Sequence, residues 1–238
     1  MSERRRDFHT QIFTAQREWA EDGIPILTAS VELPAPEDTD RIARRIRRYY
    51  RLQSRAFLRY CEHQLLPYAK AAYRTALAAS APLPCFQAEL TCRVTYNENG
   101  LWSLYTQSRE TGLPGQLLVR RWGDTWDLHT GYPLPLGSFF APRRPWRRQL
   151  LSLAAAEIER QQRLGIAHYH EDWRRRLRRT FNARNFYLTP EGLAFFFPMY
   201  AIAPAVERVP VFLLPRDAEG LRFPCAVPPE EQKNAAAE

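Results

Sequence analysis

The chain has 238 residues, which is enough for one sizeable domain or for two smaller ones that share a core. Hydrophobic residues make up 45% and charged residues 25%, as in soluble globular proteins and unlike disordered chains. The formal net charge of +8 comes almost entirely from arginine, which favours an anionic partner. Since arginine codons are GC-rich, genomic base composition is an equally simple source of this charge.

The first residues, MSERRRDFHTQIF, are basic but lack the apolar stretch of a signal peptide. No run approaches the length of a transmembrane helix. We therefore expect a cytoplasmic protein, or an extracytoplasmic one if an anchoring segment has been removed.

The cysteines form no disulfide framework; they are Cys61, Cys85, Cys92 and Cys225. Cys85 and Cys92 lie at the two ends of one predicted strand, roughly 20 Å apart at the usual rise per residue. A disulfide needs Cα atoms within about 7 Å, so this pair is excluded. Free thiols in a reducing compartment are expected.

The start of the chain predicts a β-hairpin. Strand-like runs at 8–19 and 24–33 are joined through Asp22-Gly23, a pair typical of tight hairpin turns. The prolines at 34–36 are expected to end the second strand.

A long helix is predicted from Asp38 to about Leu77, where apolar residues recur at a spacing near 3.6. Its start can be capped by Asp38, Thr39 or Asp40. Pro67 predicts a kink or the start of a second helix, because proline lacks a donor and clashes with the preceding turn.

The middle of the chain predicts an antiparallel meander. After a linker at 80–84, residues 86–96 alternate cleanly between apolar and polar. One face of this strand would carry Phe86, Ala88, Leu90, Cys92, Val94 and Tyr96. A turn at 97–100 leads to a strand at 101–109, and a segment with glycine and proline leads to another at 116–128.

Two more helices are predicted at 145–164 and 171–181. The first would end at Gly165 and bury an apolar face. That face is Leu150, Leu153, Ala154, Ile158 and Leu164. Glu171 and Asp172 are expected to cap the second helix.

Short apolar runs close the chain. Residues 186–189 and 193–197 predict a hairpin around Pro190-Glu191-Gly192, and 209–214 predicts a last strand. The end, 227–238, is rich in proline, charge and alanine, and is expected to be disordered.

Together these elements predict an α+β fold with antiparallel sheet, a long N-terminal helix and two further helices. We expect two interlocked subdomains, at 1–82 and 83–215, followed by a tail at 216–238.

Several of these segments resemble a known family. Upstream, the matching motifs are Val94–Asn97, Thr125–Gly131 (TWDLHTG) and Leu134–Phe140. Near the end they are Asn185–Thr189 (NFYLT), Gly192-Leu193 and Tyr200–Pro204 (YAIAP). Over about residues 8–215 the chain resembles the RsiV-type domain. That domain is the extracellular part of a membrane-anchored anti-sigma factor that senses lysozyme, and it also accompanies PdaC-like peptidoglycan deacetylases. The resemblance implies a module that binds a protein or a cell-wall-related ligand.

This sequence departs from the family pattern in two places. Where the family carries TGGAHG, this chain has Thr111–Gln116 (TGLPGQ), with no histidine. Where the family often has glycine before the last strand, this chain has Glu207-Arg208. It also lacks the membrane span and sigma-binding segment of RsiV and the deacetylase catalytic domain, so those activities are not implied.

The densest group of candidate metal ligands is His168-Tyr169-His170-Glu171-Asp172. Two histidines at i and i+2 share a face of an extended segment, but a third ligand would have to come from elsewhere. The simpler interpretation is a helix start. Cys61-Glu62-His63 lies on a predicted helix, where i and i+2 point apart. We expect no metal site and no cofactor.

Catalytic groupings are weak. Asp124 and Asp127 would fall on opposite faces of a strand, which is poor for an acid/base pair. Ser103, His129 and Asp127 can be combined on paper, but a triad is defined by geometry. We expect no catalytic residues; an unrecognised hydrolase is the third hypothesis.

Arginine clusters at 41–51, 143–148 and 174–184 are interleaved with aromatic residues, as in surfaces that bind phosphates and bases. The alternative is a solvated helix face whose arginines pair with nearby acidic residues. Those acidic residues are Glu157, Glu159, Glu171 and Asp172.

The leading hypothesis is thus a non-catalytic module that recognises a protein, lysozyme-like in the family, or a cell-wall-related ligand. Binding of nucleic acid or another polyanion through the arginine-rich helices is the alternative. Candidate partner-binding residues are Arg109, Glu110, Gln116, Arg174, Arg175 and Arg178.

Overall fold

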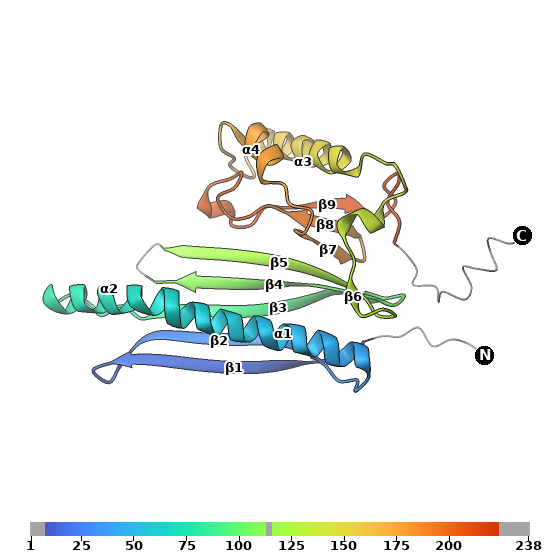
Figure 1. Ribbon diagram of the computed structural model, residues 1–238. Coiled ribbons are helices and arrows are strands. Elements are labelled where there is room, and N and C mark those ends of the chain that lie inside the picture. The colour runs from blue at the N-terminus through green and yellow to red at the C-terminus, as the bar shows by residue number, and fades with distance from the viewer. Residues whose placement is uncertain (1–7, 113–115, 224–238) are drawn as a thin grey trace, which may run out of the picture.

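A computed structural model describes residues 8–112 and 116–223. The predicted disorder of 227–238, the state of Cys225 and part of the Thr111–Gln116 segment lie outside the described residues. A long sheet carries a helical segment on one face and a smaller unit of strands and helices on the other (Figure 1). The α+β fold class is confirmed.

The six strands of the large sheet follow each other in sequence order. They are β1 (Thr10–Glu21), β2 (Ile24–Pro36), β3 (Phe86–Glu98), β4 (Leu101–Thr111), β5 (Leu117–Asp127) and β6 (Tyr132–Pro133). The predicted hairpin is confirmed: Asp22 and Gly23 both have positive φ (51° and 78°), as a type I′ turn requires. The meander of β3, β4 and β5 is confirmed by two antiparallel ladders.

One pairing in this sheet is parallel. Strand β2 runs alongside β3 from Leu27 opposite Phe86 to Val31 opposite Leu90. Parallel neighbours need a long connection that returns to the same end of the sheet. The helical segment between these strands supplies that connection.

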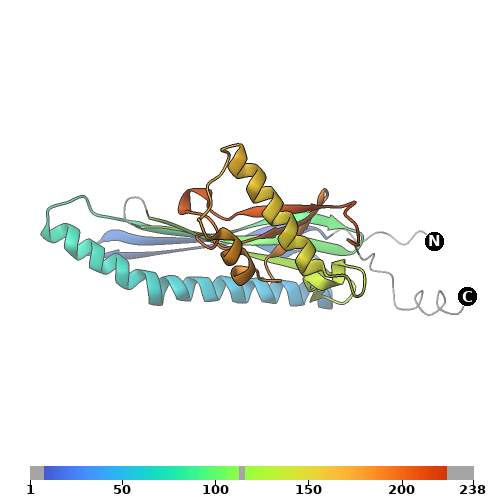
Figure 2. The same ribbon diagram turned by 90° about the horizontal axis from the view of Figure 1, so that it is seen from above.

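The helical segment consists of α1 (Arg41–Tyr60), a π-helical turn η1 (Cys61–Leu65) and α2 (Leu66–Ala78). It runs along the length of the sheet (Figure 2). Asp40 is the cap, since its Oδ1 accepts a hydrogen bond from the Ala43 amide at 2.7 Å. Pro67 lies in the first turn of α2, where its missing N–H costs little, so the predicted start of a second helix is confirmed.

The smaller unit follows β6 in the chain. It contains η2 (Leu136–Phe139), α3 (Trp146–Arg163), α4 (Trp173–Thr180), η3 (Ala205–Glu207) and a sheet of order β7-β8-β9, with β7 (Phe186–Thr189), β8 (Gly192–Phe196) and β9 (Val211–Pro215). Both predicted helices and the predicted hairpin are confirmed. Gly165 ends α3 with φ of 62°, as expected for a C-terminal glycine.

Two details of these helices were predicted wrongly. Leu164 is 61% exposed, because the chain has left α3 at that residue and its side chain no longer shares the buried face. Asp172 occupies the N-cap position of α4 without capping it. Its carboxylate instead accepts hydrogen bonds from Arg175 and Arg176.

Strand β4 is buried on both faces, and each face joins a different core. Trp102 and Leu104 pack with Tyr50 and the helical segment in the first core. Leu101 packs with Leu188 and the smaller unit in the second. The first core combines residues from both sides of residue 82. The division at 82 and 215 stays a prediction.

The predicted apolar face of β3 is wrong at the C-terminal end of the strand. A register shift between Val94 and Tyr96 inserts an extra residue and turns the strand over. Tyr96 therefore belongs to the second core, while Ala88 and Leu90 belong to the first. Val94 is exposed rather than buried.

The smaller unit approaches the large sheet closely at Gly123 of β5. A Cβ atom placed on Gly123 would lie 1.8 Å from the carbonyl oxygen of Phe186 in β7. Beside it, Ser103 Oγ of β4 accepts a hydrogen bond from the Leu188 amide at 2.9 Å. These two contacts fix the position of β7 against the large sheet.

We predict that Gly123→Ala destabilises the protein by about 3 kcal/mol, because the new methyl group must displace backbone and not a flexible side chain. Gly137→Ala is the control, since its nearest neighbour would be Trp146 Nε1 at 3.7 Å, and it should change stability by under about 1 kcal/mol. Urea denaturation measures both, and equal midpoints would contradict the close approach.

Candidate functional site

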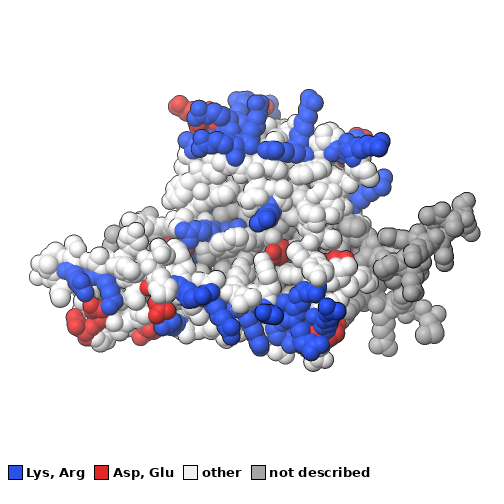
Figure 3. Space-filling view, viewed as in Figure 1, with Lys and Arg blue, Asp and Glu red and all other residues white. Residues whose placement is uncertain are grey.

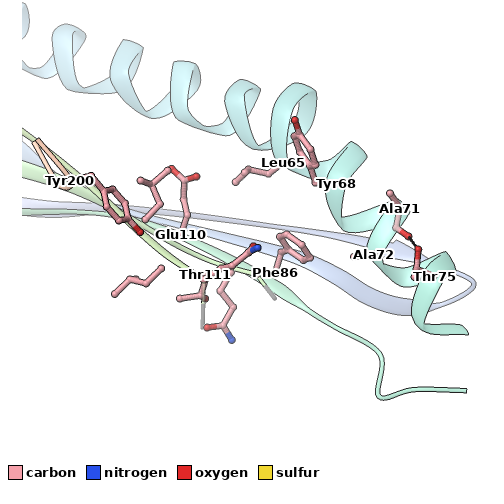
Figure 4. A pocket seen from close by; sticks show the side chains of 14 residues that line it. Leu65, Tyr68, Ala71, Ala72, Thr75, Phe86, Glu110, Thr111 and Tyr200 are labelled. Carbon is pink, nitrogen blue, oxygen red and sulfur yellow. Dashed lines mark hydrogen bonds between the residues drawn. The ribbon is translucent and has the colours of Figure 1, made fainter. Parts of the chain in front are cut away.

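A groove lies between the helical segment and the side chains that β4 and β5 direct toward it. It contains two neighbouring cavities, of about 660 and 370 Å³, and Glu110 lines both. Figure 4 shows the larger one, with Tyr68, Ala72 and Thr75 of α2 across from Glu110 and Tyr200. Volumes of this size suit a ligand or a segment of a partner chain.

Glu110 is a buried carboxylate held by two partners. Tyr60 OH donates to its Oε2 at 2.8 Å, and Arg120 Nη1 donates to its Oε1 at 2.8 Å. The guanidinium of Arg120 also lies 5.2 Å from the centre of the Tyr60 ring. Since a buried charge is costly unless it is paired, this arrangement keeps a fixed ion pair in the floor of the groove.

Two residues that line the smaller cavity each have a buried polar atom without a hydrogen-bond partner in the described chain. These atoms are Ser108 Oγ, on a residue that is almost fully buried, and Gln53 Oε1. The amide of Gln53 is oriented by its Nε2, which donates to Thr106 Oγ1 at 2.9 Å. Both atoms are shielded from solvent, so a ligand in the cavity would reach them only if neighbouring side chains moved.

Aromatic side chains line the groove and remain open to solvent. Trp122 of β5 is 43% exposed and Tyr68 of α2 is 69% exposed. Tyr49 and Tyr200 are also exposed. Figure 3 shows that this surface, over β4 and β5, carries few charged side chains between the arginine-rich α1 and the arginine-rich upper helices.

Next to Trp122 along β5, Asp124 joins a chain of hydrogen bonds. Trp126 Nε1 donates to Tyr50 OH at 3.0 Å, and Tyr50 OH donates to Asp124 Oδ2 at 3.1 Å. Tyr49 OH donates to the other oxygen at 3.3 Å. Burial raises the pKa of Asp124 to about 6, against the smaller lowering by the two hydroxyls.

The thiol nearest this groove is that of Cys61, which is buried. Burial, and then the charge of Glu110, raise its pKa to about 12. A thiol in this state is a poor nucleophile. Cys61, Cys85 and Cys92 are free, as predicted.

One family model matches the C-terminal part of the chain. Residues 137–217 match the family model described as "Protein of unknown function (DUF3298)". The match covers the smaller unit and includes Tyr200, but none of the other residues that line the groove. Among curated proteins, no relative matches the sequence.

Two solved structures of DUF3298 proteins share the fold over nearly the whole chain. One is from Bacteroides fragilis, with a TM-score of 0.63 and 14% identity, covering 91% of this chain and 95% of that one. The other is from Pseudomonas aeruginosa, with a TM-score of 0.59 and 16% identity, covering 92% and 95%. At this identity the likeness establishes the fold alone. The RsiV-type assignment stays a prediction.

The structure separates the predicted partner-binding residues into three places. Glu110 and Gln116 line the groove. Arg109 lies on the opposite face of β4 and lines a different cavity. Arg174 and Arg178 line a third cavity, between α3 and α4, and Arg175 pairs with Asp172. Their role in binding a partner stays a prediction.

The solvated-face interpretation of the arginines holds on α4. Arg174 pairs with Glu159, and Arg175 and Arg176 pair with Asp172, whose pKa they hold down at about 2. These pairs are exposed and contribute little to stability.

The residues considered for chemistry do not assemble. Ser103 Oγ bonds to Thr125 Oγ1 and accepts from Leu188, while Asp127 accepts from the His129 amide. Ser103, His129 and Asp127, which could be combined on paper, therefore do not form a triad. Of the described residues, no three from His, Cys, Asp and Glu come together where they could hold a metal ion, and no described histidine lines the cavities.

Sequence reasoning missed most of the groove. Tyr60, Gln53, Ser108 and Arg120 were not singled out, because nothing in their spacing links one helix to two strands. A signal was present in β4, where the buried face changes from Trp102 and Leu104 to Thr106, Ser108 and Glu110. Polar residues on an inward-facing strand position indicate a site.

Within the described residues, no helix has the length and apolarity needed to cross a membrane.

The raised pKa of Asp124 predicts a pH effect. Between about pH 4 and 6 the folded protein binds this proton more tightly than the unfolded chain. Its contribution to stability is therefore fully present below about pH 4 and is lost as pH rises through about 6. On going from pH 7 to pH 4, the wild type should gain roughly 2 kcal/mol relative to Asp124→Asn.

Urea denaturation across this pH range tests the effect. Asp217→Asn removes the charge of an exposed aspartate and is the control, and it should follow the wild type. Parallel pH profiles for the wild type and Asp124→Asn would contradict the burial of a titrating carboxyl group.

Proposed function

We propose that this protein is a non-catalytic binding module that receives a segment of a partner protein in the groove along α1, α2, β4 and β5. The observation that carries the proposal is the exposed aromatic side chains of Trp122 and Tyr68, which line two neighbouring cavities that share Glu110. A peptide segment suits this surface, since its apolar side chains can cover the exposed aromatic rings.

The composition of the groove also fits a protein partner. Trp, Tyr and Arg dominate the residues that carry most binding energy in protein interfaces. Here Trp122, Tyr60, Tyr68 and Arg120 lie along one surface, with Arg120 already oriented by Glu110. A preformed surface loses less entropy on binding than a flexible one.

The RsiV-type resemblance makes a lysozyme-like protein the first partner to test, and a cell-wall fragment the second. We expect lysozyme titrated into the protein to give saturable binding by calorimetry. Trp122→Ala should weaken this binding at least about tenfold, because it removes a central anchor of the groove. Soluble peptidoglycan fragments form a parallel titration that identifies a glycan ligand instead.

Tyr132→Ala is the matched control, since it also removes an exposed aromatic side chain, but from β6 outside the groove. It should bind as the wild type does. If neither probe binds the wild type, or if both variants lose affinity equally, the groove is not the binding site for these ligands.

Polyanion binding is the second candidate, favoured by the arginines that gather over α1 in Figure 3. Arg48, Arg51, Arg55 and Arg59 are exposed. If this surface binds nucleic acid, a labelled oligonucleotide should bind in low salt and dissociate steeply as salt rises. Absence of binding by fluorescence anisotropy at low salt would remove this candidate.

A further inference from the structure

On the face of β4 and β5 opposite the groove, three arginines line a cavity of about 320 Å³. Arg109 comes from β4, Arg121 from β5, and Arg208 from the loop between η3 and β9. Segments about 100 residues apart in the sequence thus place three permanent positive charges around one small space.

Arg121 is fixed in position before any ligand binds. Its Nε and Nη2 both donate to Gln107 Oε1, at 3.1 and 2.7 Å. Its guanidinium also lies 4.2 Å from the centre of the Tyr105 ring. Since a guanidinium has five N–H donors, others remain for a ligand.

Arg208 has a backbone conformation that is unfavourable for a residue with a side chain. Its φ is 55° and its ψ is −116°, a combination that glycine adopts freely and other residues rarely adopt. Non-glycine residues in such conformations concentrate at binding and catalytic sites. An arginine here therefore costs stability that a glycine at the same position would not cost.

The side chains that line this cavity carry more positive than negative charge. Among the described residues, none of the three arginines forms an ion pair. Glu207 also lines the cavity, but its Oε1 accepts a hydrogen bond from the His168 amide at 2.7 Å. Three cations and one carboxylate leave an excess of positive charge.

We propose that this cavity binds a phosphate group, carried by a small phosphorylated ligand. A phosphate has close to two negative charges and three oxygens, which match several planar guanidinium groups better than a single carboxylate does. The cavity volume is near the lower limit of ligand sites, which suits a phosphate with a small substituent. This site is independent of the groove, from which the sheet separates it.

The test uses inorganic phosphate as the probe, with acetate as the carboxylate comparison, in calorimetric titrations at low ionic strength. We expect saturable binding of phosphate and much weaker binding of acetate. Arg109→Gln should weaken phosphate binding about tenfold, and Arg208→Gly should abolish saturable binding. Because glycine relieves the backbone conformation, Arg208→Gly should also raise the melting temperature of the ligand-free protein.

Arg55→Gln is the matched control, since it removes one positive charge from the exposed face of α1. It should bind phosphate as the wild type does. Equal losses in Arg55→Gln and Arg109→Gln would show general attraction to a basic protein and overturn the site. Unchanged phosphate binding in Arg208→Gly, or acetate binding as tight as phosphate binding, would also overturn it.

Discussion

The structure depends on β4 being covered on both faces. Its even-numbered side chains pack against the helical segment, and its odd-numbered side chains face the smaller unit. In the second contact, the Ser103 hydroxyl accepts a hydrogen bond from the Leu188 amide, and Gly123 leaves room for the Phe186 carbonyl. A buried amide without an acceptor would be costly, so this serine ties the two layers together.

Much of the fold could be predicted from the sequence because it follows from local periodicity. The alternation of β3, the 3.6-residue spacing of α1 and α2, and the Asp22-Gly23 turn each reflect a local physical constraint. The parallel pairing of β2 with β3 could not be predicted, since alternation carries no information about direction. The bulge near Val94 could not be predicted either, because one extra residue reverses the faces of the strand without changing the pattern of residue types.

The groove was harder to predict, since its chemistry depends on distance across elements. Glu110 was chosen as a candidate, but its partners Tyr60 and Arg120 come from a helix and from the next strand. Asp124 is also a carboxylate facing α1, yet its described hydrogen bonds come from the neutral hydroxyls of Tyr49 and Tyr50. Burial therefore raises its pKa, and residue type alone could not show this.

In the sequence, Arg109-Glu110 and Arg120-Arg121 each look like one charged cluster. The two-residue period of a strand divides both pairs. Glu110 and Arg120 meet on the helical side, where they neutralise each other in the floor of the groove. Arg109 and Arg121 lie on the other side, where the described chain supplies no ion-pair partner for them. The same two strands thus present a nearly neutral, aromatic surface on one face and an unbalanced cationic cavity on the other. Arg208 adds a further positive charge to that cavity, although its positive φ would be more stable in a glycine. A residue that lowers stability at its own position is typical of a functional position.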